Sequence, residues 1–401
     1  MNRSILFTAI TSVILVAACN ESDEKDPPVA SFNINPESAE VGVTINFQST
    51  SMDATAFEWD FDDGSNSMEE NPSHVFASDG EFRVKLTASN EDGSDEASKS
   101  IVITPTSPCW TRLEDLQVAR SHHISAAVNG RIYVMGGNNM SEVEEYDPST
   151  DTWTKKADIP TPRQGPSGCV VDGKIYVIGG LSGGFTEIFH STVEVYDPVS
   201  DTWTEKAPMP SERINHASVA LNGKIYVFGG NIGWNDAQLY NTIEMYDPDT
   251  DEWTTLAPNG FISRWGLTAC TLNGKIYAIG GSNAVTMPIN SLQTVQEYDP
   301  IANTWINKSD MPTARAHLSS ALVNDKIYVI GGDAAELQVL QTVEAYDPQA
   351  NTWETKNPIS VETARPGACE LDHLIYVSGG IDENHDDYSY FYVYDPSCDT
   401  N

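Results

Sequence analysis

The sequence predicts an all-β protein in which an immunoglobulin-like β-sandwich, residues 29–104, precedes a six-bladed β-propeller, residues 109–401. Two observations predict this fold. Residues 29–104 alternate apolar and polar positions between turn residues, as strands with one buried face do. After residue 106 one strand pattern recurs six times, and a long repeat of this kind is typical of propellers.

The charge of the chain narrows the range of its partners. The 22 basic and 58 acidic residues give a formal net charge of −36. Nucleic acid is not an expected partner, because phosphate binding requires a cationic surface. We attribute the acidity to solubility, because like charges keep protein molecules apart in solution. The sequence contains no phosphate loop, nucleophile elbow or CxxC pair, and we expect no cofactor.

The first residues have the features of an export signal. Arg3 precedes an apolar run that is too short to remain as a membrane span and ends in Val16-Ala17-Ala18-Cys19. This ending resembles the cleavage site of bacterial lipoproteins, which implies a signal peptide over residues 1–18 and a lipid on Cys19. The alternative is an ordinary secretory signal in which the cysteine is incidental. We favour the lipid, followed by an acidic tether over residues 19–28.

This reading predicts the location of the protein. We expect an exported protein of the bacterial cell envelope, anchored in the outer membrane or at the cell surface. It would contact the membrane only through the lipid on Cys19, because no later segment is apolar enough to cross a bilayer.

Five segments of the first domain read as strands: VASFNIN, TINFQST, AFEWDFDDG, FRVKLTASN and SKSIVIT. The run Trp59-Asp60-Phe61-Asp62-Asp63-Gly64 and the later Asn71-Pro72 resemble the PKD domain, which implies a spacer or adhesion module. Clustered carboxylates also suggest calcium. Asp and Gly are equally the residues that a tight turn needs, and we favour the turn.

The second domain is defined by its repeats. Gly-Gly pairs begin at residues 136, 179, 229, 280, 331 and 379, and each follows a strand such as KIYVIGG. A Tyr-Asp-Pro sequence follows each pair, and a Trp follows in all but the last repeat. These landmarks resemble kelch repeats, which implies six blades of four antiparallel strands. Asn-Gly sequences suit the turn between the first two strands, and Pro ends the third strand.

The last repeat lacks its tryptophan. The other repeats carry it five residues after the Pro, at Trp153, Trp203, Trp253, Trp305 and Trp353. The chain ends where a sixth is due, so we assign that place to Trp110. The last blade then takes three strands from the C-terminus and one from the start of the domain, which leaves no open sheet edge. Cys109 and Cys398 would meet in one turn, and we predict a disulfide between them.

Three further cysteines, Cys169, Cys270 and Cys369, share one position on the innermost strand, ten residues before a Gly-Gly pair. Their recurrence in alternate blades suggests a metal site. The other three blades carry Ala or Val at this position, and buried cysteine behaves as a small apolar residue. We favour the apolar role and expect no metal, because no CxxC or nearby His completes a site.

Strand order predicts which face of the propeller is functional. The long, varied loops after the Gly-Gly pairs and the links from each fourth strand to the next first strand emerge on one face, called the upper face here. The links carry six arginines: Arg120, Arg163, Arg213, Arg264, Arg315 and Arg365. A ring of guanidinium groups would suit a carboxylate, sulfate or acidic peptide. Alternatively, the arginines hold the blades by bonding strand-end carbonyls.

Aromatic residues accompany these arginines. Trp265, Trp234 and Tyr240 lie in upper loops and could form a platform for a sugar or a peptide. They could equally fold under their own loops.

Two function classes follow from this arrangement. We favour a monomeric binding protein whose upper face holds a glycan or protein partner that could be anionic. The alternative is an enzyme, because some exported kelch proteins are sialic acid epimerases. In that case Arg213 or Arg264 would hold the substrate carboxylate, and Glu187 or Glu336 would act as acid or base.

Overall fold

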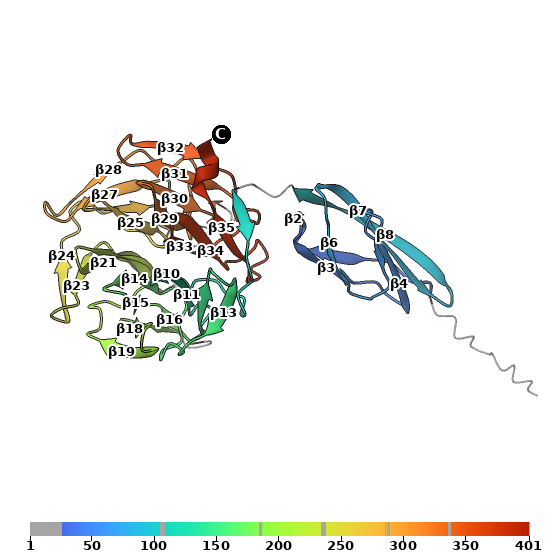
Figure 1. Cartoon of the computed structure of the whole chain (residues 1–401), viewed down its shortest axis with the longest axis horizontal. Helices are drawn as coiled ribbons and strands as arrows, with labels where there is room; N and C mark the ends of the chain where they lie inside the picture. Colours follow the sequence, from blue (N-terminus) through green and yellow to red (C-terminus); the bar gives the residue numbers. More distant parts are fainter. Residues whose placement is uncertain are drawn as a thin grey trace, which may run out of the picture. The chain divides into compact units, whose positions relative to one another are not determined.

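The computed structural model describes residues 26–104, 109–183, 187–233, 238–284, 286, 289–335 and 338–400. They form two compact units that divide after Pro105, and each unit is built of strands (Figure 1). Across these ranges we find no helix with the length and apolar character of a membrane span. The signal peptide and Cys19 lie outside the described residues.

The first unit is a two-sheet sandwich, as the alternating pattern predicts. One sheet has the order β1 (Phe32–Asn35), β3 (Thr44–Ser49) and β6 (Ser73–Val75). The other has the order β2 (Ser38–Glu40), β8 (Gly93–Thr104), β7 (Gly80–Asn90), β4 (Ala56–Asp60) and β5 (Asn66–Ser67).

The indole of Trp59 lies at the centre of this sandwich. It is fully buried, with the ring of Phe32 4.9 Å away and that of Phe47 5.6 Å away. The acidic residues that follow it serve the turn. Asp60 accepts the backbone N–H of Asp62, and Asp63 accepts a bond from the backbone N–H two residues on. These side chains therefore bond the local backbone of the turn, which is the role that we favoured for them.

The second unit contains six antiparallel sheets of four main strands each, numbered here as blades 1 to 6 in chain order, with the strands of each blade given from the axis outward. Blade 1 contains β10 (Ile124–Val128), β11 (Arg131–Met135), β12 (Val143–Asp147) and β13 (Thr152–Lys155). Blade 2 contains β14 (Ser167–Val171), β15 (Lys174–Ile178), β18 (Val193–Asp197) and β19 (Thr202–Lys206). Blade 3 contains β20 (Ile214–Leu221), β21 (Lys224–Ile232), β23 (Ile243–Asp247) and β24 (Glu252–Leu256).

The second half of the ring repeats this design. Blade 4 contains β25 (Thr268–Leu272), β26 (Lys275–Ile279), β27 (Val295–Asp299) and β28 (Thr304–Asn307). Blade 5 contains β29 (Ser319–Val323), β30 (Lys326–Ile330), β31 (Val343–Asp347) and β32 (Thr352–Thr355). Blade 6 contains β33 (Gly367–Leu371), β34 (Leu374–Ser378), β35 (Phe391–Tyr394) and β9 (Trp110–Arg112).

Two upper loops contain short strands that the sequence does not predict. In blade 2, β16 (Leu181–Ser182) pairs with β17 (Ile188–Phe189). In blade 3, β22 (Gln238–Leu239) pairs with the end of β21. These pairings give the two loops their own backbone hydrogen bonds above the ring.

Each blade has the same aromatic contact at its outer edge. The tyrosine of the third strand lies against the tryptophan of the fourth, with ring centroids 4.7–5.0 Å apart in all six blades. In blade 6 the pair is Tyr394 and Trp110, so Trp110 fills the sixth tryptophan position as predicted. Its indole also donates to the carbonyl of Asn357, in the link that leaves blade 5.

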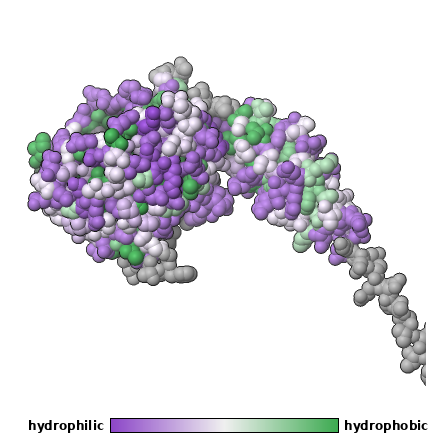
Figure 2. Space-filling model, turned by 60° about the horizontal axis from the view of Figure 1, so that its bottom comes forward, coloured by the Kyte–Doolittle hydropathy of each residue, from purple (hydrophilic) through white to green (hydrophobic). Residues whose placement is uncertain are grey.

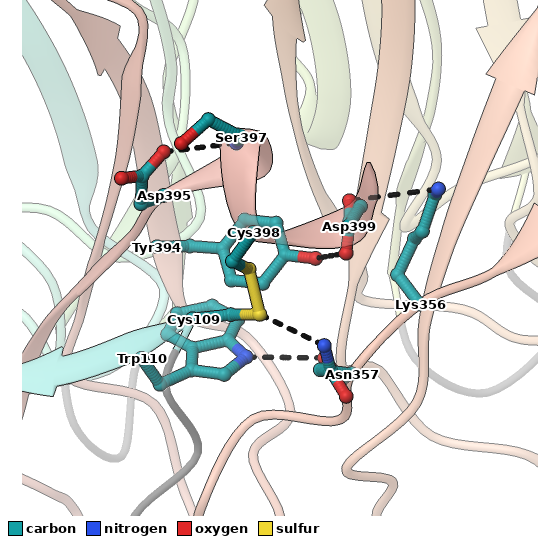
Figure 3. Close-up of a disulfide and its surroundings, with 9 residues drawn as sticks. All are labelled: Cys109, Trp110, Lys356, Asn357, Tyr394, Asp395, Ser397, Cys398 and Asp399. Atoms are coloured by element: carbon teal, nitrogen blue, oxygen red, sulfur yellow. Dashed lines mark hydrogen bonds and ion pairs between the residues drawn. A yellow bond between two sulfur atoms is a disulfide. The ribbon is translucent and has the colours of Figure 1, made fainter. Parts of the chain in front are cut away.

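The predicted disulfide joins Cys109 to Cys398 and closes the ring next to this contact (Figure 3). The two residues are 289 positions apart in the chain, with Cα atoms 5.5 Å apart. A short 3-10 helix, η2 (Pro396–Thr400), carries Cys398. The hydroxyl of Tyr394 donates to Asp399, as the tyrosines of blades 1 to 3 do to an Asp five residues later.

The surface shown in Figure 2 is largely hydrophilic, with scattered apolar side chains. In the described part of the propeller the large exposed apolar residues lie in blades 2 and 4 and in the link between blades 3 and 4: Ile188, Val199, Ile262, Ile301 and Ile306.

Candidate binding site at the propeller axis

Four of the six predicted arginines hold their own blade together. Arg120 shows the pattern: its guanidinium donates to the carbonyls of Gly136 and Glu142 and forms an ion pair with Glu144. The same set of a glycine carbonyl, a carbonyl before the third strand and a Glu recurs in three further blades, around Arg163, Arg213 and Arg315.

The fifth arginine lacks the acidic partner. Arg264 donates to the amide oxygen of Gln296, which stands where the other blades have Glu, and to the carbonyl of Ala278. Burial lowers the pKa of Arg264 to about 9, which leaves it charged at neutral pH. The ring of Phe261 lies 5.2 Å from the guanidinium carbon.

These contacts correct the proposed ring of ligand-binding guanidinium groups. All five side chains have an exposed fraction of 0%. They therefore cannot contact a ligand on the surface, and Arg213 and Arg264 cannot hold a substrate carboxylate. Bonds to strand-end carbonyls, the alternative role, are what the structure shows. The carbonyls belong to the arginine's own blade rather than to its neighbour.

Arg365 does not belong to this set. Arginines one to five each precede the first glycine of their blade by sixteen residues, and that position in blade 6 is Thr363. Its hydroxyl donates to the carbonyl of Gly379, as the arginines of blades 1, 2, 3 and 5 do to the equivalent glycine. The grouping of Arg365 with the other five arginines is therefore wrong. Arg365 lies two residues further along the link, closer to the axis.

The residues at this later position form a closed ring around the axis. They are His122, Gly165, Asn215, Gly266, His317 and Arg365. The backbone N–H of each donates to the carbonyl of the ring residue before it, and His122 donates to Arg365 to complete the circle, at 2.7–3.2 Å. All six have left-handed backbone, with φ between 48° and 62°.

The left-handed backbone of this ring suggests that its side chains have a functional role. Left-handed conformation costs a residue with a side chain roughly 1–2 kcal/mol, and glycine avoids this cost. Only two of the six positions are glycine. Strained positions that retain large side chains cluster at functional sites. The side chains at the other four positions are therefore candidates for ligand contact.

The ring surrounds a cavity of about 90 Å³, lined by the six ring residues and the residue after each. Several buried polar atoms of the lining residues have no hydrogen-bond partner among the described residues: Nδ2 of Asn215, Nε of Arg365, Nδ1 of His123 and both ring nitrogens of His216. The atoms of Asn215 and Arg365 are donors in every protonation state, and Asn215 is 8% exposed. A buried donor without a partner costs free energy, which a bound acceptor would recover.

Two carboxylates lie close to Arg365, and each is already bonded to another group. Asp333 is buried and accepts Nδ1 of His317 at 3.0 and 3.2 Å. Asp387 accepts the side-chain amide of Asn138. Burial lowers the pKa of Arg365, and these two carboxylates oppose the change. Within the described residues, no ion pair joins either carboxylate directly to the guanidinium.

The histidines around the axis differ in role. Burial lowers the pKa of His122 well below its ordinary value, and nearby Arg365 and His317 add to this effect, so His122 is neutral at pH 7. Burial also lowers the pKa values of His123 and His216 to about 3. His317 has both an acidic partner and a place on the cavity wall.

The predicted aromatic platform is corrected in part. Trp265 is 8% exposed, and its indole donates to the carbonyl of Ala284. The indole packs against the imidazole of His317, with 5.1 Å between the two aromatic centroids, and so helps to hold His317 in place. Tyr240 is half-buried and lies 4.4 Å from the guanidinium carbon of Arg213. Trp234 lies outside the described residues.

The structure does not bring the two acidic candidates to the predicted arginines. Glu187 is exposed, directly before β17, and Glu336 lies outside the described residues. No described contact brings Glu187 to Arg213 or Arg264. The sequence therefore missed the axial set of Asn215, His317 and Arg365. Each ring residue lies two positions after the arginine position that recurs in the repeats, and this spacing could have identified the set.

The three remaining cysteines are free thiols. Burial raises their pKa values, to about 12 for Cys169, 11 for Cys270 and 12 for Cys369. Sγ of Cys270 lies 3.2 Å from the hydroxyl of Ser320 in the next blade. Among the described residues, the one cluster with metal-ligand spacing is the disulfide pair with Asp399, whose sulfurs are bonded to each other.

Comparison with known proteins gives the family. The family model described as the KLHDC2/KLHL20/DRC7 Kelch-repeats domain matches residues 90–230 and 215–400, and the PKD domain model matches residues 25–105. Kelch-like protein 35 of Mus musculus is 33% identical over 69 residues, which cover 17% of this chain and 11% of that protein. The Influenza virus NS1A-binding protein homolog of Xenopus laevis is 39% identical over 70 residues, which cover 18% and 10%.

The matched segment thus spans about a tenth of the length of these curated relatives. Among solved structures, that of YjhT superposes with a TM-score of 0.62 and 18% identity, and the match covers 69% of this chain and 95% of that one. At this identity the likeness concerns the fold. With two family-model matches that together span the propeller, the chain belongs to the kelch-repeat family and carries a PKD domain before its propeller.

Proposed function

We propose that this protein is an exported binding protein of the cell envelope, tethered through a lipid on Cys19, and that its propeller binds an anionic group of a glycan or protein at the axis. The lipoprotein-like sequence before Cys19 supports the tether and the location. The axial ring supports the binding role, because it combines a cavity, left-handed side-chain positions and unpaired donors.

One observation carries the choice of an anion. The Nε of Arg365 is buried in the wall of the cavity and has no partner within the described residues. A guanidinium is permanently charged and forms its strongest hydrogen bonds with carboxylates and phosphates. The chain as a whole has a formal net charge of −36, so Arg365 would offer an anion a local attraction that the rest of the protein does not.

A second candidate is a carbohydrate isomerase that acts at the same cavity. It is favoured by the pairing of His317 with Asp333, since an imidazole oriented by a carboxylate can transfer a proton. Arg365 would hold the substrate, and His317 would act as the acid or base. These residues replace the pairs of Arg213 or Arg264 with Glu187 or Glu336.

The test is a titration of the purified protein, expressed from Asn20 without lipid, with sialic acid, glucuronate, glucose and an acidic peptide. Proton NMR would report line broadening on binding and new anomer signals on turnover. We expect carboxylate ligands to bind to the wild-type protein and Arg365→Asn to abolish this binding. Asn is chosen because it tolerates left-handed backbone, so the variant should keep the fold of the ring. Arg131→Gln, which removes a cation at a turn between the first two strands, is the control. Anomer exchange faster than in buffer would establish the isomerase instead.

Binding that survives in Arg365→Asn would contradict the proposed site. If no anion binds to the wild-type protein at millimolar concentration, the axial ring has another role and the proposed function fails.

A further inference from the structure

His317 lines the axial cavity, and the proposed anion does not engage it. His317 is 8% exposed and is fixed on three sides. Its Nδ1 bonds to Asp333, Trp265 covers one side of the ring, and the imidazole of His122 meets it edge-on, 5.8 Å between centroids. The remaining nitrogen, Nε2, has no hydrogen-bond partner among the described residues, while His317 lines the cavity.

The order of the ring places these groups relative to one another. Asn215 belongs to blade 3 and Arg365 to blade 6, so the two unpaired donors lie on opposite sides of a ring of six. His317 belongs to blade 5 and is the neighbour of Arg365. A carboxylate on the axis would thus have a donor on either side, and a group attached next to it would reach His317.

The hydrogen-bonding capacity of His317 indicates what that group is. Its Nε2 accepts a hydrogen bond when the ring is neutral and donates one when the ring is protonated. A hydroxyl both donates and accepts, so it pairs with His317 in either state. An apolar neighbour would leave this nitrogen without a partner, at a cost in binding.

The size and shape of the cavity suit a small acid. Its volume of about 90 Å³ has room for several water molecules, and a carboxylate with one adjacent hydroxyl fits in such a space. The cavity is open rather than enclosed, so a larger ligand can extend out of it.

We infer that the axial cavity recognises a hydroxy acid, a carboxylate with a hydroxyl on the neighbouring carbon. Arg365 and Asn215 bind the carboxylate, and His317, positioned by Asp333, binds the hydroxyl. This inference rests on the proposed function and names the ligand class of the same site. It separates hydroxy acids from acidic peptides, whose carboxylates have no hydroxyl on the neighbouring carbon.

The experiment compares ligands that differ only in the hydroxyl. The purified protein from Asn20 onward is titrated with glycolate and acetate, and with lactate and propionate, while the histidine ring protons are followed by NMR. The signal of His317 is identified by its loss in His317→Gly. We expect each hydroxy acid to bind about tenfold tighter than its partner and to shift the His317 signal.

Two variants test the assignment without breaking the ring. Glycine already occupies two ring positions with the same backbone, so His317→Gly and Asn215→Gly should fold, which a melting curve checks. His317→Gly should bind glycolate only as well as acetate. Asn215→Gly should weaken both acids equally, because it removes a carboxylate donor.

The outcomes separate this inference from the proposed function. If acetate and glycolate bind equally and both depend on Arg365, the hydroxyl site is wrong while anion binding stands. If an acidic peptide binds at the axis more tightly than glycolate, the ligand is a protein and the inference fails. If neither acid binds, or if both bind to Arg365→Asn, the inference and the proposed function both fail.

Discussion

His216 follows the ring residue of blade 3, and at that position two other blades have leucine, Leu267 and Leu318. Burial lowers the pKa of His216 to about 3, whereas an unfolded histidine titrates near 6.5. Between these pH values the unfolded chain binds a proton that the folded chain does not. Stability must therefore fall as the pH decreases from about 6.5 toward 3.

We predict that His216→Leu removes part of this acid sensitivity. The wild-type propeller should lose about 2 kcal/mol through this one histidine between pH 7 and pH 5, since each pH unit below 6.5 costs about 1.4 kcal/mol. The variant should lose correspondingly less. Urea unfolding at both pH values measures the difference, and His373→Asn, at an exposed turn, is the control. Equal acid losses in His216→Leu and wild type would show that His216 is already protonated when folded.

At the scale of single residues, the sequence located the arginines of blades 1 to 5 but not their environment. Arginine is rarely fully buried, so a sequence offers no reason to expect Arg163 at 0% exposure. Only the fold places a glycine carbonyl and Glu194 around it. Arg365 was misassigned because residue type was matched instead of spacing, which leads to Thr363.

At the scale of strands and links, the second glycine of each pair connects neighbouring blades. In blade 1, the N–H of Gly137 donates to the carbonyl of Arg163 in blade 2. The glycine has φ of 90°, and a Cβ atom there would lie 2.4 Å from the carbonyl oxygen of Ser121. The backbone of the link and the glycine can approach this closely only without a side chain.

We predict that Gly137→Ala destabilises the propeller by about 3 kcal/mol, from left-handed strain and from this steric clash. Gly130→Ala is the matched control, because Gly130 also has positive φ but nothing lies within 4 Å of the added carbon. It should cost only about 1 kcal/mol. Thermal unfolding compares the two, and equal losses would show that the clash with Ser121 adds nothing.

The four-strand blades were predictable because each landmark has a local physical cause. A primed turn needs Asn-Gly, a Pro stops a strand, and a tryptophan fills the outer edge. The short pairs β16–β17 and β22–β21 were not predicted, because two-residue strands leave no periodic pattern. Likewise, the closed ring of backbone bonds around the axis depends on all six links at once.

At the scale of the whole molecule, the Cys109–Cys398 disulfide joins the two ends of the propeller. We predict that the double variant Cys109→Ser, Cys398→Ser lowers the free energy of unfolding of the propeller by ~4–5 kcal/mol, on the chain-entropy account of a loop of this length. The sandwich should melt unchanged, because the chain divides into two separate units. Calorimetry would resolve the two transitions.

Cys270→Ala is the control for this variant, because blades 1 and 5 carry Ala at the same position. It removes a thiol without opening the ring and should leave the melting temperature within a few degrees of wild type. A double variant as stable as this control would mean that strand pairing of β9 with β35 closes the propeller by itself.

The ring closure was predictable from the sequence because the missing tryptophan and the two cysteines point to the same turn. The site at the axis was not, since its residues come from six links and share no residue type. The repeats determine the architecture of the propeller, whereas the ligand depends on a few side chains that the fold brings together.

The most direct measurement is a crystal structure of the protein with glycolate bound. The account predicts a carboxylate on the propeller axis, within hydrogen-bond distance of Arg365 and Asn215, with the adjacent hydroxyl at Nε2 of His317. A ligand bound on the outer loops or on the opposite face, with the axial cavity filled only by water, would contradict it.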